Sequence, residues 1–224
     1  MTTITTILFD LDGTLLDTAP DMAFALNKLR AANHLPDLPL SIIRPHVGYG
    51  SKALLNVGFD VNENDPRYPS LLEAFFNLYQ THLADSTQLF AGMENVLNHL
   101  DNLSMPWGIV TNKPERFTLD ILKKLNLLER TACVICGDSL AKRKPDPDPI
   151  LHACELIQQE PMKCLYVGDT EIDVIASKAA GTQSLVALYG YIGTEEDPAK
   201  WQADGYVHSP HEIIHYLQQQ IETA

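Results

Sequence analysis

The chain has 224 residues, of which 45% are hydrophobic, so it can bury a sizeable core as one domain with an insertion or as two small domains. Its 16 basic and 29 acidic residues give a formal net charge of −13, which argues against nucleic acid and membrane surfaces as partners because both attract a basic face. The N-terminal residues lack the basic stretch of a secretory leader, and no segment reaches the roughly 20 apolar residues of a membrane span. We therefore expect a cytoplasmic protein.

Short apolar runs predict six β-strands along the chain. They cover residues 4–10, 107–112, 132–137, 164–169, 184–188 and, more weakly, 205–208. Their Val, Ile and Leu residues follow one another almost without interruption, which is typical of parallel strands covered on both faces. Amphipathic segments typical of helices separate the later strands, at residues 93–103, 114–125, 149–157 and 173–181. The alternation predicts an α/β fold with a doubly wound parallel sheet, in which Pro114 is the first residue of one helix and Gly181 ends another.

The region after the first strand breaks this alternation. Residues 18–34, 51–59 and 70–84 have helical periodicity, and no convincing strand lies among them. Thr18 and Asp21 form a possible capping box before the first of these helices. We therefore predict that a helical cap domain, residues 17–85, is inserted into an α/β core formed by residues 1–16 and 86–224. Linkers near residues 16–18 and 86–90 are expected to let this cap open and close.

Polar residues follow the predicted strands at the points where the strands end. They are Asp10 and Asp12 after the first, Thr111 and Asn112 followed by Lys113 after the second, and Asp169, Thr170 and Asp173 after the fourth. Lys144 lies in the proline-rich segment "AKRKPDPDP" before that strand. Ligands of open parallel sheets bind at this edge, so we expect these side chains to meet there.

The grouped carboxylates indicate a metal site. Carboxylates that lie close together repel one another unless a cation neutralises them, and a set of oxygen ligands without His or Cys favours a hard cation such as Mg²⁺. One aspartate could then act as a nucleophile and another as an acid or base. Each feature alone has an ordinary explanation: a turn at Asp12-Gly13, a helix cap at Thr111-Asn112, a surface lysine at Lys144. Together, at successive strand ends, they are hard to explain by chance.

These segments resemble four motifs of the haloacid dehalogenase (HAD) phosphatase superfamily, and the resemblance covers essentially the whole chain. The pattern D-x-D-G-T-[LV] matches residues 10–15, and the threonine that ends a strand matches Thr111. The lysine before Pro-x-Pro matches Lys144, and G-D-[ST]-x-x-D matches residues 168–173. The resemblance implies a HAD-like core, with the helical insertion as the small cap of that family.

The resemblance also implies a role for each residue. Asp10 would attack phosphorus to form an aspartyl-phosphate, and Asp12 would protonate the leaving oxygen and later deprotonate water. Thr111, Lys144 and Asn112 would hold the phosphoryl oxygens. The implied Mg²⁺ ligands are the Asp10 carboxylate, the Asp12 carbonyl and Asp169, with Asp173 supporting the metal's waters or Lys144.

Within the superfamily, the chain is similar to the phosphoglycolate phosphatase group, through "DLDGTLLDTAPD", "VTNKP" and "KPDPDPIL". The implied substrate is a small phosphorylated metabolite, 2-phosphoglycolate, handled by a monomer or small homo-oligomer. Other segments, such as "YGYIGTEEDPAKWQADGY", are more similar to N-acetylmuramic acid 6-phosphate phosphatases, which leaves that substrate as the alternative. The residues expected to bind phosphate or substrate are Gly13, Arg44, Gly48 and Tyr49, with His46 and Arg116 as further determinants of specificity. An ordinary interhelical turn is the other interpretation of residues 44–55.

Other classes of function were weighed against this one. His211 and His215 fit the H-E-x-x-H pattern of zinc peptidases, but only nine residues follow to supply a third ligand. Cys133 and Cys136 form a C-x-x-C pair in an apolar run, where reduced core cysteines are the simpler interpretation. A phosphosugar mutase would share the core and the cap, and a binding module that lacks catalysis would not need all of the aspartates.

Overall fold

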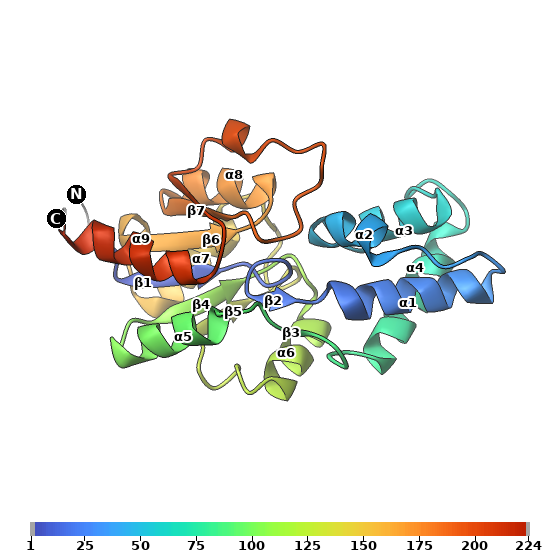
Figure 1. Cartoon of the computed structure of the whole chain (residues 1–224), viewed down its shortest axis with the longest axis horizontal. Coiled ribbons are helices and arrows are strands. Elements are labelled where there is room, and N and C mark those ends of the chain that lie inside the picture. The colour runs from blue at the N-terminus through green and yellow to red at the C-terminus, as the bar shows by residue number, and fades with distance from the viewer. Residues whose placement is uncertain (1–2, 223–224) are drawn as a thin grey trace.

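The computed structural model describes residues 3–222, with side chains as far as residue 219. Its centre is a six-stranded parallel sheet in the order β5-β4-β1-β6-β7-β8 (Figure 1). The strands are β1 (Thr6–Phe9), β4 (Trp107–Val110), β5 (Cys133–Ile135), β6 (Cys164–Gly168), β7 (Gln183–Ala187) and β8 (Gly205–Val207). Each coincides with one of the six predicted apolar runs to within two residues at either end. The predicted α/β fold with a parallel sheet is therefore confirmed.

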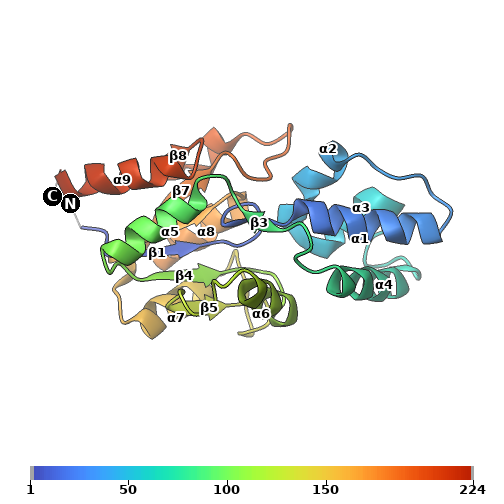
Figure 2. The same cartoon turned by 60° about the horizontal axis from the view of Figure 1, so that its bottom comes forward.

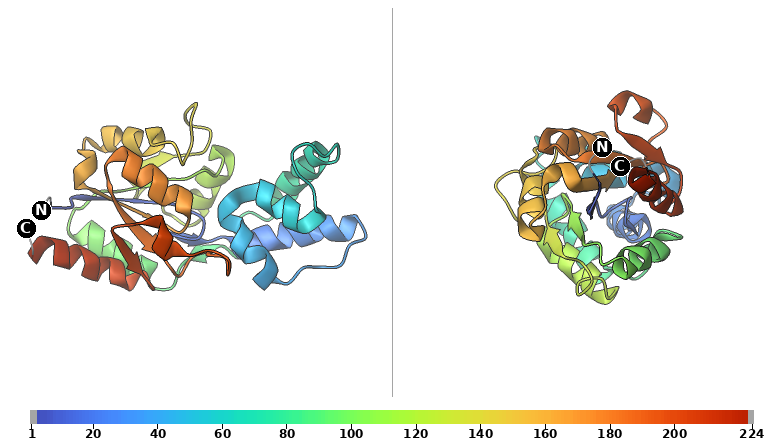
Figure 3. Two further views of the ribbon diagram at one scale, coloured as in Figure 1. Left: turned by 90° about the horizontal axis from the view of Figure 1, so that it is seen from above. Right: turned by 90° about the vertical axis from the view of Figure 1, so that its left-hand side faces the viewer.

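Helices cover both faces of the sheet. Along β1, the buried residue Leu8 packs in one apolar cluster while Ile7 and Phe9 pack in another, because successive side chains of a strand point to opposite faces. The Leu8 cluster includes α7 (Asp148–Ile157) and α8 (Glu171–Ala180), and the other includes α5 (Met93–Asn102), α6 (Glu115–Lys124) and α9 (His211–Glu222). The end-on view shows the helices surrounding the strands (Figure 3). The sheet is therefore doubly wound, and the apolar residues of its strands pack in clusters on both of its faces.

Four helices and a 3₁₀ turn form a separate group beyond the carboxyl edge of the sheet (Figures 1 and 2). They are α1 (Ala19–Ala32), α2 (Leu40–Ile43), η1 (Arg44–Tyr49), α3 (Gly50–Phe59) and α4 (Tyr68–Thr81). We call residues 18–87 the helical insertion. The three long helices are those that the sequence predicts, whereas α2 and η1 were not expected. The division into two domains stays a prediction.

A two-stranded antiparallel ribbon lies where the chain enters and leaves the insertion. Strand β2 (Leu16–Asp17) pairs with β3 (Gln88–Leu89), so that Leu16 faces Leu89 and Asp17 faces Gln88. Both strands fall within the predicted linkers, where no strand was expected. Two residues are too few to show a periodic pattern, and this pairing depends on contacts between segments about 70 residues apart in the chain.

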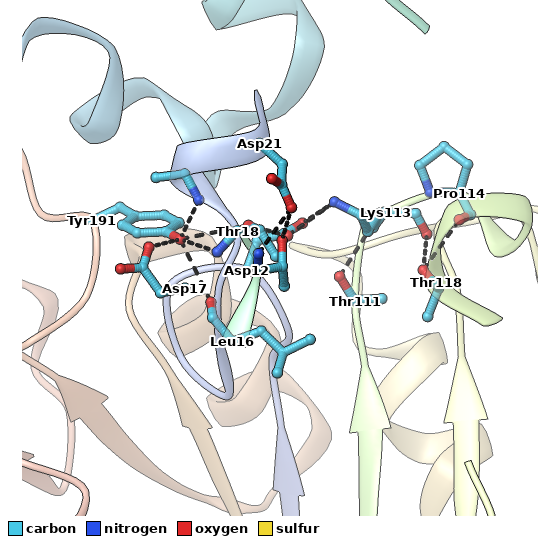
Figure 4. Close-up of polar contacts among 12 residues, drawn as sticks. Asp12, Leu16, Asp17, Thr18, Asp21, Thr111, Lys113, Pro114, Thr118 and Tyr191 are labelled. Atoms are coloured by element: carbon cyan, nitrogen blue, oxygen red, sulfur yellow. Dashed lines mark hydrogen bonds and ion pairs between the residues drawn. The ribbon is translucent and has the colours of Figure 1, made fainter. Parts of the chain in front are cut away.

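The predicted capping box before α1 is wrong. The Thr18 hydroxyl donates to Asp12 Oδ1 at 2.6 Å, and the Asp21 carboxylate accepts hydrogen bonds from the backbone and hydroxyl of Thr87 at 2.9 and 2.6 Å (Figure 4). The amides of Thr18 and Ala19 donate instead to the hydroxyl of Tyr191, at 2.6 and 2.9 Å. Partners distant in the chain therefore replace the local bonds.

Other details of the sequence interpretation can be compared with the structure. Gly181 ends α8 with a φ of +78°, as predicted, whereas Pro114 precedes the first residue of α6. All four cysteines are buried and unpaired by disulfides, as expected of core thiols. Within residues 3–222, no helix has both the length and the apolar character needed to cross a bilayer.

Candidate active site

A cavity of about 540 Å³ lies between the carboxyl edge of the sheet and the helical insertion. The sheet side contributes Asp10, Asp12, Thr111, Asn112, Lys113, Arg143, Lys144 and Thr170. The insertion contributes, among others, Gly48, Tyr49, Ser51, Lys52, Glu63, Tyr68 and Phe76. Residues separated by more than 100 positions in the chain thus meet in one place because parallel strands end at a common edge.

Lys144 lies among carboxylates at the floor of this cavity. Its ammonium nitrogen is 2.9 Å from Asp10 Oδ1 and 2.7 Å from Asp173 Oδ1. It also donates to the Val110 carbonyl at 2.9 Å and to the Tyr166 hydroxyl at 2.7 Å. The Lys144 side chain is only 2% exposed, so these contacts replace water as the solvation of its charge.

The buried carboxyls resist ionisation. Burial raises the pKa of Asp10 to about 6, the positive charge of Lys144 opposes that rise, and Asp173 adds to it. Burial also raises the pKa of Asp169 well above its ordinary value, and the carboxyls of Asp10 and Asp173 raise it further. Burial alone would lower the pKa of Lys144, but the two carboxylates beside it raise the pKa above its usual value. The site therefore has an excess of negative charge that another cation would relieve.

Asp169 is fixed by the loops around it. Its two oxygens accept hydrogen bonds from the Thr14 hydroxyl at 3.1 Å and the Tyr191 amide at 2.8 Å. Gly13 packs directly against it: a Cβ at Gly13 would lie 2.1 Å from Asp169 Oδ2, and the Gly13 φ is +86°. Glycine is needed there for both reasons. Gly13 does not line the cavity, and its expected contact with phosphate stays a prediction.

Three aspartates form a group that fits a hard cation. Asp10, Asp169 and Asp173 each offer an oxygen within 4.8 Å of the others, and all three are buried. Oδ1 of Asp10 accepts no hydrogen bond with suitable geometry from the residues that the structure describes, although the Lys144 ammonium lies 2.9 Å from it. An all-oxygen donor set with an under-used carboxylate suits Mg²⁺. Both oxygens of Asp173 are already engaged, by Lys144 and Thr170, so Asp173 acts mainly on its neighbours.

The carboxylate of Asp12 lies apart from this group. Its oxygens are 2.9 and 3.1 Å from the ammonium of Lys113, and Oδ1 also accepts the Thr18 hydroxyl (Figure 4). Asp12 still lines the cavity, with its side chain 13% exposed. The two aspartates of the first motif therefore have separate lysine partners, Lys144 for Asp10 and Lys113 for Asp12.

Thr111 and Asn112 follow β4 beside these lysines. The Thr111 amide donates to the Ile135 carbonyl at 2.9 Å, and its hydroxyl accepts the Lys113 amide at 3.2 Å. The Asn112 side-chain amide donates to the Lys144 carbonyl at 2.9 Å, which joins two of the predicted motifs directly. The side-chain oxygen of Asn112 is buried and has no partner among the described residues.

The predicted residues of the insertion separate into two sets. Gly48 and Tyr49 line the cavity, and the Tyr49 hydroxyl donates to Glu196 Oε1 at 2.6 Å, across to the sheet side. Arg44 does not line it: its guanidinium pairs with Asp17 at 3.0 Å and lies 4.8 Å from the centre of the Tyr191 ring. The part of Arg44 in substrate binding stays a prediction.

The remaining predicted determinants also lie off the cavity. Arg116 rests over the rings of Phe76 and Phe117, at 4.9 and 4.5 Å from their centres, where the insertion meets α6. His46 is not among the residues that line the cavity. On α9, the rings of His211 and His215 lie 4.9 Å apart. No third metal-ligating side chain joins these histidines within the described part of the chain.

Sequence reasoning assigned no catalytic or binding role to several residues that the structure places in the site. They are Thr14, Thr18, Lys113, Tyr166 and Tyr191. Lys113 stands directly after Thr111-Asn112, and this position was its only signal in the sequence. Tyr166 looks like any apolar residue of β6, because its hydroxyl partners become visible only in three dimensions.

Comparison with known proteins agrees with this geometry. Residues 7–187 match the family described as haloacid dehalogenase-like hydrolase. The chain is 44% identical to a phosphoglycolate phosphatase of Xanthomonas campestris over 92% of its own length and 93% of the relative's. It is 37% identical to the N-acetylmuramic acid 6-phosphate phosphatase of Pseudomonas aeruginosa, over 94% of this chain and 93% of that one.

A solved structure gives the same result. The crystal structure of a predicted phosphoglycolate phosphatase from Haemophilus somnus superposes with a TM-score of 0.85 at 25% identity, covering 96% of this chain and 99% of that one. The resemblance that the four motifs indicated is confirmed. The chain belongs to the haloacid dehalogenase-like hydrolase family.

Proposed function

We propose that this enzyme, a phosphoric monoester hydrolase, cleaves its substrate in two steps through an aspartyl-phosphate on Asp10. The observation that carries the proposal is the position of Lys144, whose ammonium lies 2.9 Å from Asp10 at the floor of a cavity that Asp12 also lines. A carboxylate nucleophile, a cation for the phosphoryl oxygens and a second carboxylate for proton transfer are the parts that phosphoryl transfer needs.

The steps follow from these residues. A carboxylate oxygen of Asp10 attacks phosphorus, the bond from phosphorus to the ester oxygen breaks, and Asp12 gives its proton to that leaving oxygen. Asp12 then takes a proton from water as the water attacks phosphorus, and the bond between phosphorus and Asp10 breaks. Lys144 and Thr111, which border the cavity on the same side, hold the phosphoryl oxygens through both steps.

Mg²⁺ is the cofactor of this proposal. Asp10, Asp169 and the backbone carbonyl of Asp12 would hold it, with Asp173 fixing Lys144 beside them. Bound there, the ion would neutralise charge on the phosphoryl group and on the clustered carboxylates. Without it, the excess negative charge of the three aspartates would repel a phosphate dianion.

Two substrates are candidates, and both carry a carboxylate in addition to the phosphate ester. 2-Phosphoglycolate is the first, through the similarity to the Xanthomonas campestris enzyme. N-Acetylmuramic acid 6-phosphate is the second, and the cavity favours it. A volume of about 540 Å³ lies within the roughly 300–1,000 Å³ of pockets that enclose drug-sized ligands, which is much more than phosphoglycolate fills. The rings of Tyr49, Tyr68 and Phe76 in its lining suit a sugar more than a two-carbon acid.

The test is phosphate release from the two substrates side by side, with Mg²⁺ and after its removal by a chelator. Activity that disappears with the chelator and returns with added Mg²⁺ supports the proposal. A larger kcat/KM for one substrate identifies the leaving group that the cavity accepts. No hydrolysis of either compound, or of a wider panel of phosphomonoesters, would refute it. Transfer of phosphate between sugar hydroxyls in place of release would identify a mutase.

A further inference from the structure

Lys113 is held at the junction of the sheet and the helical insertion. Its amide donates to the Thr111 hydroxyl at 3.2 Å, and its carbonyl accepts the Gly137 amide at 2.9 Å, so both sides of its backbone are fixed. Its side chain is 2% exposed. A lysine is rarely buried to this degree without a partner for its charge.

The partner is the carboxylate of Asp12. The ammonium nitrogen lies 2.9 and 3.1 Å from the two oxygens, so the contact fixes the rotation of the carboxylate as well as its position (Figure 4). The Thr18 hydroxyl contacts the same carboxylate at 2.6 Å from the opposite side. Asp12 is thus held between a residue of the core and a residue at the start of the helical insertion.

The insertion also covers the ammonium itself. The ring of Tyr79, on α4, has its centre 4.8 Å from the Lys113 nitrogen, a distance typical of a cation–π contact. Tyr79 is 1% exposed and packs against Phe117 of α6, with the ring centres 5.2 Å apart. Lys113 therefore has a carboxylate on one side and an aromatic ring of the insertion on another.

We propose that Lys113 is a positioning residue, which fixes the Asp12 carboxylate for proton transfer to the leaving oxygen and ties that position to α4 through Tyr79. The proposal rests on the proposed function, because it needs Asp12 to act as the acid. Lys144, which lies beside Asp10, binds the phosphoryl group in this proposal. Lys113 does not, because both hydrogen bonds of its ammonium are to the carboxylate oxygens of Asp12.

The test uses two substrates that differ in their need for an acid. The oxygen of 4-nitrophenyl phosphate leaves without a proton, whereas that of benzyl phosphate, which is similar in size, needs one. The ratio kcat/KM reports the first step alone, because the hydrolysis of the aspartyl-phosphate that follows is common to both substrates. In Lys113→Met, which keeps the length of the side chain without its charge, kcat/KM for benzyl phosphate should fall by about 10²-fold or more, and that for 4-nitrophenyl phosphate by less than about tenfold.

Asp12→Asn is the matched control and should show the same selectivity for the leaving group. Adding Lys113→Met to Asp12→Asn should then cause little further loss with benzyl phosphate, because the two residues act as a unit. An equal loss of kcat/KM with both substrates would show that Lys113 binds substrate and would overturn the proposal.

Removal of a buried charge can prevent folding, so Lys113→Gln, which retains a hydrogen-bond donor, is measured in parallel with the same two substrates. The same two results, selective loss or equal loss, support or overturn the proposal. Circular dichroism and thermal unfolding establish that each variant is folded. Wild-type enzyme that hydrolyses no phosphomonoester would refute the proposed function. Wild-type hydrolysis combined with an equal loss in the Lys113 variants would refute only the positioning role.

Discussion

The two buried lysines of the site have different surroundings. Lys144 contacts Asp10, Asp173, Tyr166 and the Val110 carbonyl, all of which lie outside the helical insertion. Lys113 contacts Asp12, whose other partner is Thr18, and it lies beneath Tyr79 of the insertion. The half of the site around the nucleophile is therefore built by the core alone. The half around the acid depends on where the insertion sits.

The strongest test of this contrast is the nucleophile. Asp10→Asn keeps the size of the side chain but replaces a nucleophilic carboxylate with an amide, so we expect kcat to fall by a factor on the order of 10⁴ or more for every leaving group. Phosphate release from benzyl and 4-nitrophenyl phosphate measures it. Activity within tenfold of wild type, in a variant with unchanged thermal unfolding, would contradict the assignment of Asp10.

Matched substitutions of the two lysines compare their contributions to stability. Lys144→Met leaves two buried carboxylates without their cation, so we expect the free energy of unfolding to fall by about 3–5 kcal/mol. Lys113→Met leaves one carboxylate, which is partly exposed and still bonded to Thr18, so we expect a loss of about 1–3 kcal/mol. Urea unfolding without metal measures both, and a larger loss for Lys113→Met would reverse the comparison.

Gly13 and Gly181 provide a matched pair for the metal-binding half. Both have positive φ, +86° and +78°, but a Cβ at Gly13 would meet Asp169 at 2.1 Å, whereas nothing lies within 4 Å of a Cβ at Gly181. Gly181→Ala should cost about 1 kcal/mol from backbone strain alone. Gly13→Ala should cost more and should also weaken Mg²⁺ binding, measured by calorimetric titration. Equal effects would show that contact with Asp169 is unimportant.

Tyr191 joins the two halves and has the smallest expected effect. Tyr191→Phe removes the hydroxyl that accepts the amides of Thr18 and Ala19, which should lower the free energy of unfolding by about 1 kcal/mol, as loss of a helix cap does. Tyr206→Phe, at an exposed tyrosine, is the control and should stay within about 0.5 kcal/mol of wild type. Chemical denaturation of both variants decides whether the hydroxyl stabilises the start of α1.

The sheet could be predicted from the sequence because its strands are continuous apolar runs, and the polar residues at strand ends followed from that topology. Asp10, Asp12, Thr111 and Lys144 were expected to meet, and the structure places all four around one cavity. The pairing of side chains within the site could not be predicted in this way. Which carboxylate Lys113 would pair with depends on how segments about 100 residues apart pack, and no local pattern encodes it.

The same reason explains the error at the start of α1. A threonine followed three residues later by an acidic residue is an ordinary signal for a helix start, and here both side chains bond elsewhere. Local signals predict local partners, and they fail where a tertiary contact is stronger.

The ribbon of β2 and β3 has a consequence for how such enzymes diversify. Because Leu16 faces Leu89 and Asp17 faces Gln88, the chain leaves the core and returns to it about one strand spacing apart, roughly 5 Å. The two ends of the core are therefore held together by this pairing, whatever the length of the segment between them. Segments of other lengths, taken from relatives with other substrates, could be grafted at this junction while Asp10, Lys144 and Asp169 keep their places. Exchange of residues 18–87 is thus a direct route to chimaeric enzymes with altered selectivity.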